Sequence, residues 1–101
     1  MMLRLLFVNR TAARSEALPA ELEARPDIAI DYASSVDEAL AEAKKCDMVL
    51  VSAALPDRGA LDVVRAVKQA DPTARILVMD LAGSHQPVSD YLEAGAAGWM
   101  L

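Results

Sequence analysis

Short apolar runs alternate along the chain with segments whose apolar residues recur at helical spacing. The runs are Leu3–Val8, Ile28–Tyr32, Met48–Val51 and Ile76–Met79. The second run alternates apolar and polar positions, which predicts a half-exposed edge strand, while the other three are almost continuously apolar, as in strands buried on both faces of a parallel sheet. The last residues, Gly98–Leu101, predict the beginning of a fifth strand.

Between the runs, apolar positions three and four residues apart predict helices. The expected helices cover Val36–Ala43, residues from about Leu61 to Ala70, and Gln86–Ala94, after a less regular first helix from about Leu18 or Pro19. Ser34 and Ser35 are candidate caps for the helix at Val36–Ala43, and Gly95 lies just past the end of the helix at Gln86–Ala94. Strands that alternate with helices at this spacing predict one α/β domain over residues 1–101, with a parallel sheet covered on both faces.

The charge and the cysteine content exclude several classes of function. The chain of 101 residues has 15 acidic and 10 basic residues, for a net charge of −5. Such a chain is repelled by a phosphate backbone and by an anionic membrane surface, so we expect no contact with nucleic acid or membrane. The single cysteine, Cys46, excludes an internal disulfide and fits a reducing cytosol, and no apolar run approaches the roughly 18–20 residues of a membrane helix. We therefore expect a soluble, cytoplasmic protein.

Three segments resemble the receiver domains of two-component response regulators. Leu50–Pro56 is similar to the family's "LLDxxxP" segment, Ile76–Asp80 to its fourth strand, and Glu93–Leu101 to its "EAGAxGYLxK" segment, with Trp99 at the aromatic position. The resemblance covers residues 3–101 and implies the flavodoxin-like (CheY-like) fold, a five-stranded parallel sheet in order 2-1-3-4-5 whose last helix is missing from this chain. The spacing is nearest to the receivers that precede helix-turn-helix transcription domains.

The departures from this family meet at its phosphoacceptor site. The resemblance implies two acids after the first strand and a nucleophilic Asp after the third, which together hold Mg²⁺; this chain has Asn9, Arg10 and Ser52 instead. A guanidinium repels a cation, and a hydroxyl is a weak nucleophile without a neighbouring base. The position of the family's Thr or Ser carries Asp80, and the family's Lys would follow Leu101. The resemblance therefore implies a pseudo-receiver, a receiver scaffold that does not take a phosphoryl group.

These features favour a non-enzymatic regulatory module that acts through protein contacts. We expect it to be the N-terminal regulatory domain of a transcriptional response regulator, with a protein partner or an attached output domain and no metal or cofactor. The alternative is a small-molecule sensor, because Asn9, Arg10, Ser52 and Asp80 form a polar rim where open parallel sheets bind ligands. An enzyme is disfavoured because there is no Gly-rich phosphate loop after the first strand and no Cys or His nucleophile near a strand end.

We also expect a homodimer. In the family a further helix covers the sheet beside the fifth strand, so Trp99, Leu101 and part of Leu77 or Met79 are expected to form an uncovered apolar surface, and such surfaces commonly mark association sites. Sedimentation up to a concentration of about 1 mM is expected to show a dimer. Strictly monomeric sedimentation over that range would contradict the expectation.

Arg10 and Asp80 form a hypothetical compensating pair. In the order 2-1-3-4-5 the first and fourth strands flank the third, so the two residues start about 10 Å apart with the small Ser52 between them. An arginine side chain that crosses Ser52 reaches Asp80, whereas the alternative is Arg10 in solvent. A double-mutant cycle on Arg10→Ala and Asp80→Ala is expected to give a coupling free energy of up to about 1 kcal/mol. Additive effects of the two substitutions would rule out the pair.

Overall fold

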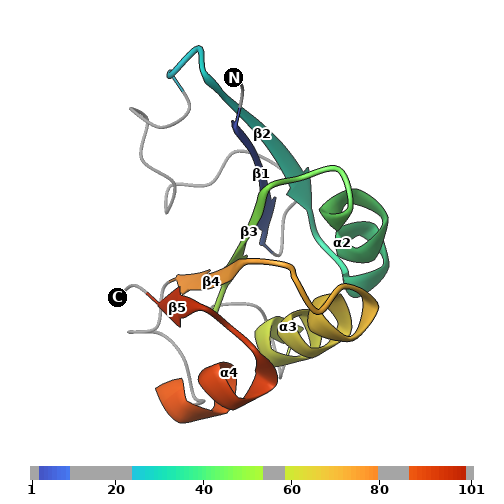
Figure 1. Ribbon diagram of the computed structural model, residues 1–101, viewed down its shortest axis with the longest axis vertical. Helices are drawn as coiled ribbons and strands as arrows, with labels where there is room; N and C mark the ends of the chain where they lie inside the picture. Colours follow the sequence, from blue (N-terminus) through green and yellow to red (C-terminus); the bar gives the residue numbers. More distant parts are fainter. Residues whose placement is uncertain (1–2, 10–23, 54–58, 80–86, 100–101) are drawn as a thin grey trace.

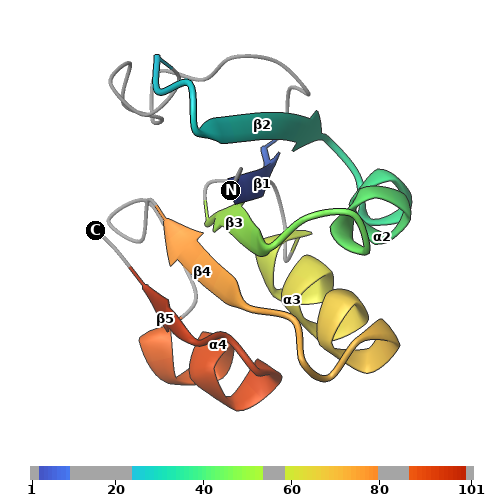
Figure 2. The ribbon, with the colours of Figure 1, turned by 45° about the horizontal axis from the view of Figure 1, so that its top comes forward.

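The described part of the chain folds into a five-stranded parallel sheet with three helices along one of its faces (Figures 1 and 2). The computed structural model describes residues 3–9, 24–53, 59–79 and 87–99. The strands are β1 Leu3–Val8, β2 Ile28–Ala33, β3 Met48–Ser52, β4 Ile76–Met79 and β5 Gly98–Trp99, and the helices are α2 Val36–Ala43, α3 Gly59–Ala70 and α4 Val88–Ala94. The sheet order β2-β1-β3-β4-β5 confirms the predicted flavodoxin-like topology.

The sheet buries apolar side chains on both of its faces. Val8, Val51 and Val78 point to the face that α2, α3 and α4 cover, where they join Leu61, Val64 and Tyr91 in the larger cluster. The alternate strand positions point to the opposite face, where Leu5, Phe7, Leu50 and Met79 form a second cluster. Because both faces of the sheet are apolar, the central strands are continuous apolar runs in the sequence, and such runs allow these strands to be predicted.

Helix α2 begins where the sequence predicts a cap. The backbone of Ser35 is extended, and its hydroxyl accepts a hydrogen bond from the backbone N–H of Glu38 at 3.1 Å. The hydroxyl of Ser34 donates to the Glu38 carboxylate at 3.0 Å instead of capping the helix. Of the two candidates, Ser35 is the N-cap, and it satisfies one of the backbone donors that every helix leaves unpaired at its start.

Helix α3 begins at Gly59, two residues earlier than predicted, because Gly59 and Ala60 give no apolar periodicity although Ala60 is buried. It ends at Ala70, before Asp71 and Pro72, as predicted. The helix predicted over Gln86–Ala94 is α4, which starts at Val88. The predicted first helix lies outside the described residues. None of the described helices is long and apolar enough to span a membrane.

Gly95 ends α4 in the left-handed conformation, with φ of 117°, as its place past the predicted helix suggested. A Cβ added at Gly95 would lie 2.6 Å from Cγ of Lys68. That lysine comes from α3, and its ammonium donates a hydrogen bond to the carbonyl of Pro72 at 3.0 Å. Two features therefore favour glycine at position 95: the left-handed backbone conformation and the stem of the Lys68 side chain, which lies where a Cβ would be.

Replacing Gly95 by Ala is expected to lower the free energy of unfolding by about 1–2 kcal/mol, since the left-handed backbone is strained for Ala and the new methyl group meets Lys68. Urea denaturation of the two proteins measures the difference. In a Lys68→Ala background the same substitution should cost less, because only the backbone strain is left. An unchanged unfolding free energy for Gly95→Ala would contradict this account.

Candidate functional site

The sheet brings Asn9 and Ser52 together at the edge where its strands end. Val8 and Val51 are paired in the register of β1 and β3, and Asn9 and Ser52 each come directly after them. Neighbouring parallel strands lie about 4.8 Å apart, so these two residues are adjacent across the sheet. The backbone N–H of Asn9 is fixed by a hydrogen bond of 3.0 Å to the carbonyl of Ala33, at the end of β2.

Ser52 lies between the ends of two strands. It pairs with Met79 of β4, and the next backbone N–H, that of Ala53, donates to the Met79 carbonyl at 2.8 Å. Its side chain is only 1% exposed, and it is the one buried polar residue in the described part of the chain. A buried polar side chain at the end of the central strand is typical of a site rather than of a core.

Of the four residues predicted at this site, the structure describes Asn9 and Ser52, which lie at neighbouring strand ends, and their role as a degenerate phosphoacceptor site stays a prediction. Arg10 and Asp80 lie outside the described residues, as does Leu101. Arg10 follows Asn9 in the chain, and Asp80 follows Met79, the residue that pairs with Ser52. The pairing between Arg10 and Asp80 stays a prediction.

The donor groups at Asn9 and Ser52 do not fit the Mg²⁺ ion that the fold family implies. A small hard cation is held mainly by carboxylates in octahedral array, whereas an amide and a hydroxyl bring no negative charge. The buried Ser52 would have to lose a proton to act as a strong ligand or nucleophile, and burial disfavours the charged form. Among the residues that the structure describes, Asn9 and Ser52 therefore bring no negative charge to this edge.

Trp99 is exposed, but it does not share a surface with Leu77 as the sequence suggested. Trp99 pairs with Val78, and Leu77 pairs with Gly98. Paired residues of a parallel sheet point to the same face, so Trp99 lies on the face of α4 and Leu77 on the opposite one. Met79 is 5% exposed and belongs to the core. The single apolar surface predicted from Trp99, Leu77 and Met79 is therefore wrong, because these side chains are divided between two faces.

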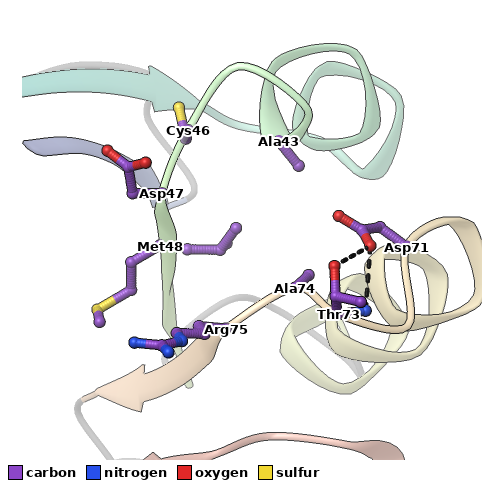
Figure 3. A pocket seen from close by; sticks show the side chains of 9 residues that line it. Ala43, Cys46, Asp47, Met48, Asp71, Thr73, Ala74 and Arg75 are labelled. Atoms are coloured by element: carbon purple, nitrogen blue, oxygen red, sulfur yellow. Dashed lines mark hydrogen bonds between the residues drawn. The ribbon is translucent and has the colours of Figure 1, made fainter.

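A cavity of ≈ 240 Å³ opens at the other edge of the sheet, where β3 and β4 begin (Figure 3). Asp47 and Arg75 lie on its strand side, and Asp71 and Thr73 lie on its helix side. Asp71 accepts hydrogen bonds from the Thr73 backbone and hydroxyl at 3.0 and 2.7 Å, and these bonds lower the pKa of its carboxyl group. No local sequence pattern predicts this cavity, because its walls come from segments that lie far apart in the chain.

Cys46 lies at this second edge and behaves as a packed residue. Burial raises the pKa of its thiol to about 11, and the nearby Asp31 carboxylate acts in the same direction. The thiol lies 3.7 Å from Asp31, which is also paired with Arg4 at 3.1 Å. A thiol with this pKa is protonated at neutral pH and therefore a poor nucleophile.

Comparisons with solved structures identify the fold. The response regulator domain of Thermotoga maritima CheB superimposes with a TM-score of 0.76 at 19% identity, covering 98% of this chain and 77% of that one. The Vibrio cholerae chemotaxis protein CheY4 superimposes with a TM-score of 0.79 at 22% identity, covering 100% of this chain and 87% of that one. A two-component response regulator of the LuxR family from Aurantimonas sp. SI85-9A1 superimposes with a TM-score of 0.75 at 27% identity, covering 98% of this chain and 73% of that one.

The chain thus has the fold of response-regulator receiver domains, and its sheet order is the one that this fold has. No protein-family model matches the sequence, and no curated protein matches it. The identities to the solved receivers are low, so the likeness establishes the architecture. What this chain does is argued below from its own residues.

Proposed function

We propose that the chain is a pseudo-receiver, a regulatory module that works without phosphorylation and without enzymatic activity. The observation that supports it best is the chemistry at the strand ends, where the neutral Asn9 and the buried Ser52 lie side by side. The receiver scaffold is kept, and the groups that would hold a cation and accept a phosphoryl group are replaced.

In this proposal the regulatory signal passes through protein contacts. Without a phosphoryl group, any switch between two states requires a partner or ligand with different affinities for them. We place the chain in the cytosol, as the N-terminal regulatory part of a transcriptional regulator. The likeness to a LuxR-family response regulator supports that setting.

A homodimer is a less favoured form of the same proposal. Its expected basis was one apolar surface around Trp99 and Leu77, and the register divides these two residues between opposite faces of the sheet. We therefore favour a different protein or an attached output domain, rather than a second copy of the chain, as the binding partner.

Incubation with Mg²⁺ and acetyl phosphate is expected to add no phosphoryl group to the chain, as measured by intact mass. The Ser52→Asp variant should also stay unmodified, because Asn9 and Arg10 supply no carboxylates to hold Mg²⁺ beside the restored nucleophile. The Ser52→Asn variant is the matched neutral control, and a receiver domain with all its acids intact shows that the reagent is active.

Two outcomes would contradict the proposal. A phosphoryl group on the unaltered chain would show a working acceptor. A phosphoryl group on Ser52→Asp but not on Ser52→Asn would show that the remaining residues still form a competent metal site.

A further inference from the structure

The cavity at the edge where β3 and β4 begin has an apolar inner wall. Val49 belongs to the larger core cluster, and Ala43 and Ala74 pack against that cluster from the end of α2 and from the turn before β4. The wall is therefore continuous with the core of the helix-covered face. The volume of ≈ 240 Å³ lies just below the range of about 300–1,000 Å³ that drug-sized ligands occupy, so a smaller molecule fits this cavity.

One ionised side chain, that of Asp71, points into the cavity. Its carboxylate extends from the end of α3 toward the strand side in Figure 3. Both hydrogen bonds from Thr73 go to Oδ1, and in the described part of the chain Oδ2 accepts none. The bonds from Thr73 lower the pKa of the carboxyl group, so it is charged at neutral pH. Oδ2 is therefore available to a donor group inside the cavity.

The backbone adds negative partial charge at the same place. Helices α2 and α3 end at this edge of the sheet, at Ala43 and Ala70 (Figure 3). The C-terminus of a helix carries about half a negative elementary charge, which favours a cation nearby. The two helix ends and the Asp71 carboxylate therefore favour the same kind of ligand.

The basic residues of this region leave the cavity open to a cation. Arg75 lines the cavity, but Figure 3 shows its guanidinium directed away from the helix ends. The ammonium of Lys68 donates to the carbonyl of Pro72 at 3.0 Å. Lys44 and Lys45, which follow α2, are exposed and are not among the residues that line the cavity.

We propose that this cavity binds a small organic cation, a primary amine that carries a short apolar group. The ammonium donates a hydrogen bond to Oδ2 of Asp71, and the apolar group packs on Ala43, Val49 and Ala74. The cavity lies at the edge of the sheet opposite the strand-end site. The inference therefore goes beyond the proposed function and does not depend on it.

The test is an amide NMR titration of the 101-residue chain with cyclohexylmethylammonium at constant ionic strength. The amides of Val49, Thr73 and Ala74 are expected to shift in a saturable manner, with a Kd on the order of 1–10 mM for so small a ligand. Cyclohexanecarboxylate has the same ring and the opposite charge, and it is expected to give no saturable shift. Cyclohexylmethanol is the neutral analogue and is expected to bind about tenfold more weakly than the ammonium.

Matched variants locate the binding. Asp71→Asn keeps an acceptor for Thr73 and removes the charge, so it should weaken the ammonium about tenfold or more and leave the affinity for cyclohexylmethanol unchanged. Asp62→Asn makes the same charge change on the exposed side of α3, outside the cavity, and should weaken the ammonium by less than about twofold. Ala43→Leu places a larger side chain against the apolar wall and should weaken both ligands.

Three outcomes would overturn the inference. These are no saturable shift with the ammonium, equal affinity for the carboxylate, or an equal loss of binding in Asp71→Asn and Asp62→Asn. The last would mean attraction to the net charge alone. Phosphoryl transfer to the unaltered chain would instead overturn the proposed function, and it would leave the titration result standing.

Discussion

The pairing of β3 with a parallel strand on each side determines where the polar residues of this protein lie. β1 and β4 both hydrogen-bond to β3, and the register fixes Asn9 beside Ser52 and Ser52 beside Met79. The central strands β3 and β4 are largely buried, so the polar side chains next to them lie where these strands begin and end. The site is thus a consequence of the sheet, and the sheet does not depend on any chemistry at the site.

Because the sheet does not depend on the residues at its strand ends, those residues can change while the fold is kept. Val8, Val51 and Val78 stabilise the sheet through burial against α3 and α4, and none of them requires a charge at the strand ends. In the proposed pseudo-receiver, an amide and a buried hydroxyl stand where the receiver resemblance implies carboxylates, and these two groups need no counter-ion.

Much of the fold could be predicted from the sequence, because the local signals and the tertiary structure agree. The apolar runs marked the strands, Ser35 marked the start of α2, and Gly95 marked the end of α4. The start of α3 was missed because Gly59 carries no periodic signal. The face of Trp99 could not be read from the sequence either, since it depends on the register between β4 and β5. For the site, the register of β1 and β3 brings Asn9 and Ser52 to the same edge, while their role as a degenerate phosphoacceptor site stays a prediction.

An amide NMR titration tests the central claim most directly. Mg²⁺ is added first and beryllofluoride, a phosphoryl mimic, is added second, while the backbone amides of Asn9 and Ser52 are followed. The account predicts no saturable change at either amide, because Asn9, Arg10 and Ser52 stand where the receiver resemblance implies the carboxylates that bind the ion and orient the mimic. Saturable shifts centred on these two residues would show a working metal and anion site, and they would contradict the account.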